Sequence, residues 1–444
     1  MTLAIVLLVA GLIVGGGIGY FAAPQTPGGS VTVTVTGTGS VVKEAPLKGA
    51  TVKFGYIASS TTGLETGKPY HEQIVAPGLN DYAELMGYDV SFEYLIDDAT
   101  GQAQVHLEKV QGFKSSGVTI FEGGGWSSQA QAALSYCNAN EILMWSSSST
   151  SPTLAIADDY LYRMCTADTA LAPALADVMW AAGVKSMVIF QRGDSWGDGI
   201  VNLLKPIWLE KGGKVAGDII RYAAESTEFS NYLTLADATV AAAVAENGGE
   251  PQRVGVVILS FDELPVIVKQ AKEYDNIYNV HWWGSDGTAK SQRGMDDAPE
   301  EVNHIGIYSL LSRETTTSRF LEIQARYEAL TAQQFGTYTA YVYDIGWVLA
   351  TSVMQAQSQA GKDVLELQAP ICLNTFGVAG WSRLDEFGDR FAPPYDVWGF
   401  FPGTNVGSPN PEKASVSIIM AQYDPDSKTT VFMNDVLGYT PIGP

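Results

Sequence analysis

The sequence predicts an α/β protein with two doubly wound, Rossmann-like lobes, a hinge and an inter-lobe cleft, preceded by an N-terminal transmembrane helix. Three observations support this prediction. Residues 3–22 form an uncharged apolar run, short β-branched runs alternate with amphipathic stretches after residue 48, and the alternation occurs as two successive series. Such alternation is typical of parallel sheets covered by helices.

The apolar run is long enough to cross a bilayer as a helix, and the first charged residue is Lys43. We therefore expect residues 1–23 to anchor the chain in the cell membrane, with the folded region on the extracytoplasmic side. A cleaved secretory signal is the alternative, but the run is long for one, lacks a basic start and is followed by Pro24. The missing basic start leaves open a leader removed upstream. Residues 24–48, rich in Pro, Gly, Ser and Thr, look like a spacer.

Composition and charge narrow the classes of partner. The 444 residues are 46% hydrophobic, which is enough for a sizeable core, and 26 basic against 48 acidic residues give a net charge of −22. A surface this acidic repels a phosphate backbone, so we expect no nucleic-acid partner.

The alternating elements define the two predicted lobes. The first series places strands at 51–57, 90–96, 117–121, 142–146 and 160–165, with helices near 71–87, 101–115 and 128–139. The second places strands at 186–191, 214–222, 254–260 and 279–284, with helices near 169–182, 197–211, 228–246 and 262–274. Helices at 318–333 and 338–359, a loop-rich region at 370–411 and a last strand at 414–422 follow. We assign 49–167 plus 309–378 to lobe 1 and 168–308 plus 379–444 to lobe 2.

No motif in the chain indicates catalysis. The sequence has no GxxxxGK[ST] loop, no GxSxG elbow and no HExxH, and its four histidines are scattered. We therefore expect a protein that is not an enzyme, with no catalytic residues, metal or cofactor.

The three cysteines lie far apart and form no CxxC pair. Cys137 would end a helix and Cys165 would lie in a nearby strand, which makes them a candidate disulfide. Three buried, unpaired thiols are the alternative.

Polar side chains follow two strands of the first series. Trp126, Ser127 and Ser128 come after Gly123-Gly-Gly and open a helix, and Ser148 and Thr150 lie in a hydroxyl-rich run after the next strand. Hydroxyls, close-approach glycines and helix amides together suggest a cradle for a ligand carboxylate. The alternative for the serines is helix N-capping.

Aromatic and acidic residues occupy the equivalent strand ends of the second series. Trp196 and Phe261 would form an aromatic wall, and Asp286 would pair with an ammonium or amide group. Core packing is the alternative for each aromatic residue, and turn capping is the alternative for Asp286.

These motifs, in this order and spacing, resemble the branched-chain amino-acid type (type I) of solute-binding proteins of ABC transporters, in a membrane-anchored, archaeal-like form. The resemblance runs from Lys48 to about Phe432 and rests on short segments that include Lys53-Phe-Gly-Tyr-Ile57, Asp97-Asp98, Ile142-Leu-Met-Trp-Ser-Ser-Ser-Ser-Thr-Ser-Pro152, Asp194-Ser-Trp-Gly-Asp-Gly199 and Gly284-Ser-Asp-Gly287.

The resemblance implies roles for particular residues. Ser127, Ser148 and Thr150 would contact the ligand carboxylate, and Asp286 would pair with its ammonium group. Trp196 and Phe261 would cover the ligand from the second lobe, and Tyr70 from the first. Trp126 adds bulk beside the cradle and Asp286 is shorter than a glutamate, so the resemblance does not assure leucine or valine as the ligand.

The sequence therefore predicts an extracytoplasmic protein that captures a small amphipathic solute, an amino acid or amide, by lobe closure and delivers it to an ABC permease. One alternative is a structural surface filament that self-assembles through residues 3–22, because the Gly15 to Gly19 segment permits close helix packing. A ligand sensor coupled to a signalling partner is a second alternative.

Overall fold

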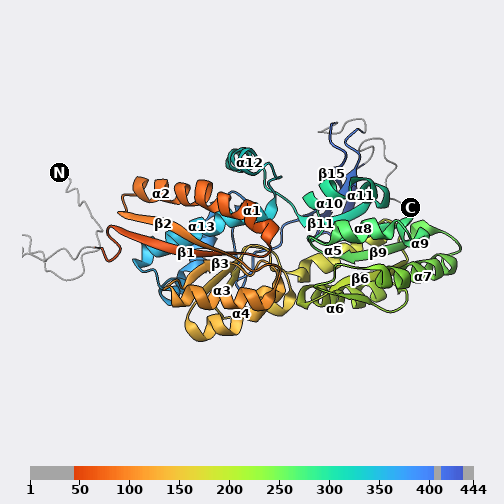
Figure 1. Ribbon diagram of the computed structural model, residues 1–444, viewed down its shortest axis with the longest axis horizontal. Coiled ribbons are helices and arrows are strands. Elements are labelled where there is room, and N and C mark those ends of the chain that lie inside the picture. Colours follow the sequence, from red (N-terminus) through yellow and green to blue (C-terminus); the bar gives the residue numbers. More distant parts are fainter. Residues whose placement is uncertain (1–44, 405–411, 434–444) are drawn as a thin grey trace, which may run out of the picture. The chain divides into compact units, whose positions relative to one another are not determined.

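Two β-sheets, each with helices on both faces, organise the protein (Figure 1). The computed structural model describes residues 45–404 and 412–433. The predicted anchor at 1–23 and most of the spacer lie outside these residues. Among the described helices, none is both long and apolar enough to cross a membrane.

The first sheet is parallel throughout and has the strand order β2-β1-β3-β4-β5. Its strands are β1 (Ala50–Ala58), β2 (Val90–Asp98), β3 (Ile120–Glu122), β4 (Leu143–Ser146) and β5 (Leu161–Arg163). Its crossover helices are α1 (Thr61–Tyr70), a π-helical turn (His71–Val75), α2 (Ala76–Leu85), α3 (Ala103–Ser115) and α4 (Ser127–Asn140). A 3-10 turn (Pro152–Leu154) precedes β5.

Side chains of β1 alternate between two cores, as the pleat of a strand requires. Val52 and Phe54 pack with α2 and with a helix from the C-terminal half, whereas Ile57 packs with α3 and α4 on the opposite face. Gly55 is required for this packing, because an added Cβ would lie 2.4 Å from the Phe113 ring.

The second sheet combines parallel and antiparallel strands. Its parallel part contains β6 (Ser186–Gly193), β7 (Lys214–Val215), β8 (Ile220–Ala223), β9 (Val254–Leu259), β10 (His281–Gly284) and β11 (Ile307–Ser312). The antiparallel strands β14 (Tyr395–Phe401), β15 (Val416–Asp424) and β16 (Thr429–Phe432) extend it beyond β11.

Seven helices accompany the second sheet. They are α5 (Asp168–Ala181), α6 (Ser195–Glu210), α7 (Ser230–Glu246), α8 (Leu264–Ala271), α9 (Asp275–Tyr278), α10 (Gln292–Asp297) and α11 (Pro299–Ile305). A 3-10 turn (Pro251–Arg253) precedes β9. One core packs α5 and α6 against the sheet, and another packs α7, α8 and α11.

Lobe 1 contains the first sheet with its helices, and lobe 2 contains the second sheet with its helices. After β11 the chain returns to lobe 1, and before β14 it goes back to lobe 2. The returning elements are α12 (Ser318–Thr331), α13 (Thr337–Ala356), α14 (Gly361–Val364), a 3-10 turn (Leu365–Leu367), α15 (Gln368–Leu373) and the hairpin β12 (Phe376–Gly377) and β13 (Gly380–Trp381). Residues of α12 and α13 complete the core over α1 and α2. The chain thus crosses between lobes three times, after β5, after β11 and before β14.

The structure corrects several sequence-based expectations. The single strand predicted at 214–222 is two strands, β7 and β8, because Gly217 between them adopts φ +64°. The helix predicted at 71–87 begins earlier, at Thr61, and contains the π-helical turn. The loop-rich region contains β14, and β11 continues past the lobe boundary predicted at 309.

The candidate disulfide is not formed, and the alternative of three buried thiols is confirmed. Cys137, Cys165 and Cys372 are all free and buried. Burial raises the pKa of the Cys137 thiol to about 12, so these cysteines act as small apolar core residues.

Candidate functional site

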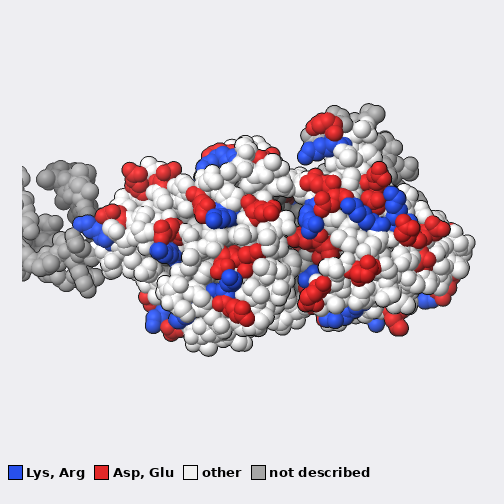
Figure 2. All heavy atoms as spheres, viewed as in Figure 1, with Lys and Arg blue, Asp and Glu red and all other residues white. Residues whose placement is uncertain are grey.

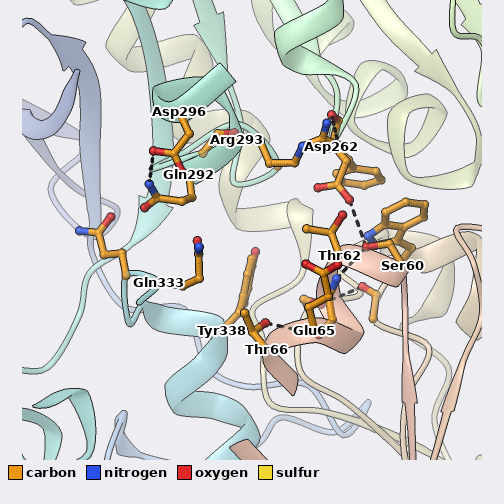
Figure 3. A pocket seen from close by; sticks show the side chains of 18 of the residues that line it. Ser60, Thr62, Glu65, Thr66, Asp262, Gln292, Arg293, Asp296, Gln333 and Tyr338 are labelled. Atoms are coloured by element: carbon orange, nitrogen blue, oxygen red, sulfur yellow. Dashed lines mark hydrogen bonds between the residues drawn. The ribbon is translucent and has the colours of Figure 1, made fainter. Parts of the chain in front are cut away.

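A cavity of about 650 Å³ lies where the carboxyl ends of strands from both sheets meet (Figure 3). Lobe 1 contributes the start of α1 and the segments after β3 and β4, and lobe 2 contributes the segments after β9 and β10 together with α10. Strand ends of open α/β sheets are where such folds bind ligands. The cavity is therefore the candidate site.

The two hydroxyl-rich segments of lobe 1 are held against each other by their own side chains. The Ser148 hydroxyl donates to the Gly125 carbonyl oxygen at 2.9 Å, and the Ser127 hydroxyl accepts from the Ser151 amide at 3.1 Å. The helix α4 has Trp126 as its N-cap and no side-chain capping bond, so neither Ser127 nor Ser128 is a capping residue. The two segments of the predicted cradle therefore lie together, with much of their hydroxyl capacity used in bonds between them.

A buried arginine holds the second segment of this cradle through its backbone. Arg163 donates from Nη1 to the carbonyl oxygens of Ser149 and Ser151, both at 2.8 Å, and its guanidinium forms an ion pair with Asp389. Arg163 has no exposed surface. A buried charge is tolerated only when it is paired, so Asp389 keeps the Arg163 guanidinium in place. Arg163 in turn holds the two carbonyl groups of the cradle.

An aromatic stack closes one wall of the cavity and crosses between the lobes. The Phe261 ring of lobe 2 lies between Trp126 of lobe 1, at 5.0 Å between centroids, and Trp196 of lobe 2, at 4.2 Å. The Arg192 guanidinium lies 5.0 Å from the Trp126 ring. Trp126 and Phe261 line the cavity, whereas Trp196 is buried behind them and supports Phe261.

Asp286 is the buried acidic group of the cavity. Its side chain is on a residue only 9% exposed, and its Oδ2 accepts a hydrogen bond from the Tyr338 hydroxyl of α13. Its Oδ1 has no hydrogen-bond partner among the described residues. Burial raises the pKa of Asp286, and the Tyr338 hydrogen bond opposes that rise. A cationic group arriving at Oδ1 would compensate this buried carboxylate.

A second acidic residue links the lobes directly. The Ser60 hydroxyl donates to Oδ2 of Asp262 at 3.0 Å, while the same Ser60 oxygen accepts the Gly63 amide at 3.2 Å and so caps α1 (Figure 3). Burial raises the pKa of Asp262 and the Ser60 hydrogen bond opposes that rise. This bond and the Trp126–Phe261 stack are contacts that exist only while the lobes are together.

Four of the nine residues proposed from the sequence line the cavity. These are Trp126, Ser148, Phe261 and Asp286. Ser127, Ser128, Thr150 and Trp196 lie in the same segments but outside its lining.

Tyr70 is elsewhere. It is 1% exposed, packs edge-on against Tyr327 at 5.0 Å and donates its hydroxyl to the Thr339 carbonyl oxygen. Its expected position over the ligand is therefore corrected, because α1 directs it into the core. Tyr327 of α12 lines the cavity instead.

Several lining residues were not identified from the sequence. They include Ser60, Glu65, Asp262, Arg293 and Tyr338. A usable signal existed for Ser60, because Ser59-Ser-Thr-Thr62 follows a strand in the same way as the two predicted segments. No group of three or more His, Cys, Asp or Glu side chains placed to hold a metal occurs in the described part of the chain.

Comparisons with known proteins agree with this architecture. The profile of the receptor family ligand binding region matches residues 79–402. An uncharacterized protein of Methanocaldococcus jannaschii is 24% identical over 401 residues, covering 86% of this chain and 92% of that protein.

Solved structures share the fold. A leucine binding protein from Thermotoga maritima has a TM-score of 0.67 at 18% identity, covering 85% of this chain and 99% of its own. A branched-chain amino acid transporter substrate binding protein from Streptococcus pneumoniae, in complex with isoleucine, has a TM-score of 0.62 at 17% identity, covering 83% and 99%. A solute binding protein from R. palustris in complex with benzoate has a TM-score of 0.63 at 17% identity, covering 87% and 98%.

Proposed function

Because the chain belongs to the receptor family of ligand-binding regions, we propose that it is an extracytoplasmic solute-binding protein for a small amphipathic solute, an amino acid or amide. The observation that carries this proposal is Asp286, a buried carboxylate on the cavity wall with one oxygen unpartnered in the described structure. A ligand ammonium or amide N–H would satisfy that oxygen.

The opposite end of such a ligand would meet lobe 1. Backbone amides of the segments after β3 and β4 would hold a carboxylate or carbonyl oxygen, and the Ser148 hydroxyl, whose proton is donated to the Gly125 carbonyl oxygen, would have to turn from that bond to take part. Ser127, Ser128 and Thr150 would contribute by fixing the shape of these segments. The Trp126–Phe261 stack would cover the apolar part of the solute.

Lobe closure would be the working step. The Ser60–Asp262 hydrogen bond and the Trp126–Phe261 stack both join the lobes, so opening must break them before a solute can enter or leave. Closure around the ligand excludes water and strengthens its polar contacts.

The solute would then pass to an ABC permease. This step, like anchoring in the cell membrane through residues 3–22, extends the proposal beyond the described residues. The filament alternative depends on the same N-terminal run, and no described feature favours it.

A thermal-shift screen of the full-length chain in mild detergent tests the proposal. A ligand that binds only the folded state raises its melting temperature, so amino acids, amides, urea and aromatic acids are compared at equal concentration. A shift with amino acids or amides supports the proposal. A shift with aromatic acids alone, or with none of these compounds in a protein that melts cooperatively, refutes it.

A further inference from the structure

The cavity is more acidic than an aliphatic zwitterion requires. Of its 21 lining residues, five are acidic and one, Arg293, is basic. A neutral amino acid offers one cationic group, and Asp286 alone would compensate it. The remaining carboxylates therefore point to a further property of the ligand.

The only basic side chain on the lining is already occupied. Arg293 lies 3.3 Å from Oδ2 of Asp297 and donates from Nη1 to the Asp262 carbonyl oxygen at 3.1 Å. It therefore offers little to a second carboxylate on a ligand. Apart from the five carboxylates, the other polar side chains of the lining are uncharged: hydroxyls, amides and the Trp126 indole.

Three further carboxylates have no ion-pair partner among the described residues. Asp262 accepts from Ser60, Asp296 accepts from the Gln292 amide at 2.8 Å, and Glu65 makes neither a hydrogen bond nor an ion pair with any described residue. Glu65 comes from α1 of lobe 1 and Asp296 from α10 of lobe 2, so closure brings their charges toward one cavity (Figure 3). Like charges gathered across a closing cleft oppose closure unless a cation lies between them.

The charge of the rest of the molecule does not offset these carboxylates. Acidic and basic side chains both occur on the two lobes in the face shown in Figure 2, and the whole chain carries a net charge of −22. A cationic solute would be attracted to this cleft, and an anionic one repelled.

We propose that the solute has two cationic nitrogen groups joined by a flexible chain. One is held at Asp286, and the other lies between Glu65 of lobe 1 and the carboxylates of Asp262 and Asp296 of lobe 2. The inference rests on the proposed binding function and narrows it to basic amino acids and diamines. A cavity of about 650 Å³ has room for such a chain.

Lysine and norleucine provide the test, because they differ only in the terminal ammonium group. Calorimetric titration of the full-length chain should show lysine binding roughly tenfold more tightly than norleucine, since partly exposed charge pairs contribute modestly and several act together. Cadaverine tests whether the carboxylate is needed, and the lysine preference should shrink as salt is added.

Two variants separate this proposal from the broader one. Glu65→Gln changes an exposed residue and should reduce the affinity for lysine more than the affinity for norleucine. Asp286→Asn should weaken both ligands. Norleucine binding as tightly as lysine overturns the dication proposal and leaves the binding function standing, whereas failure of all three ligands to bind counts against both.

Discussion

Replacing Asp286 by Asn isolates the charge of the residue that carries the proposed function. The substitution keeps the size of the side chain and its position beside Tyr338, and it removes the negative charge that would face a ligand ammonium. Breaking one partner of a buried charge pair costs about 2–5 kcal/mol. Because Asp286 keeps 9% exposure and some contact with water, we expect the lower part of that range, about 2–3 kcal/mol, or a 30- to 150-fold loss of affinity.

Asp286→Asn should raise the stability of the ligand-free protein, although it weakens ligand binding. Burial raises the folded-state pKa of Asp286, so its contribution to stability is present at low pH and is lost as pH rises through that pKa. Once ionised, this buried carboxylate therefore lowers the stability of the ligand-free protein. Asp286→Asn should melt at a higher temperature than the wild type without ligand, yet show a smaller ligand-induced shift.

Calorimetric titration and thermal denaturation measure the two effects on the same samples. Asp218→Asn is the matched control, because Asp218 is an exposed residue of lobe 2 between β7 and β8. The ligand affinity of this variant should equal that of the wild type. Tyr338→Phe should weaken ligand binding by about 1 kcal/mol, because it removes one hydrogen bond to the Asp286 carboxylate. Unchanged affinity in Asp286→Asn would refute the assignment of Asp286 as the ammonium partner.

Three further outcomes follow from the site. Asp389→Ala leaves Arg163 buried and unpaired, so it should lower the free energy of unfolding by roughly 3–5 kcal/mol in denaturant titration, and a loss under 1 kcal/mol would contradict the pairing. Ser60→Ala removes a hydrogen bond across the closed lobes and should weaken binding by about fivefold, with X-ray scattering showing a more open average; identical scattering would argue against this contact as a latch. Ligand affinity should fall on acidification through the raised pKa of Asp286, at a higher pH than an exposed aspartate would give, and Asp286→Asn should lose that dependence; retention of the pH dependence would assign it to another group.

The parts of the fold that could be predicted are those with strong local patterns. The alternation of β-branched runs with helices located most strands of both sheets, because buried parallel strands such as β9 are short runs of mostly apolar, β-branched residues. β14 escaped prediction because Tyr395-Asp-Val-Trp-Gly-Phe-Phe401 follows two prolines and contains Asp396 and Gly399, which interrupt the pattern of a strand. Its pairing with β11 is a tertiary effect.

The candidate site likewise has residues that the sequence could predict and residues that it could not. Trp126, Ser148, Phe261 and Asp286 could be located because each follows a predicted strand, and strand ends converge in this class of fold. The support of the cradle could not be predicted, since Arg163 and Asp389 lie 226 residues apart in the chain and nothing local connects them. Tyr70 was misplaced because its ring packs edge-on against Tyr327 and Phe335, which lie more than 250 residues further along the chain, so no local pattern indicates the contact.

The central claim is that the cleft recognises the amino group of its solute. Calorimetric titration of the full-length chain with leucine, glutamine and lysine, each beside its Nα-acetyl counterpart, tests that claim most directly, because acetylation removes the α-amino charge and retains the rest of the molecule. Whichever of these amino acids binds should lose about 30-fold or more in affinity when acetylated. Equal affinity for the free and acetylated forms would contradict it.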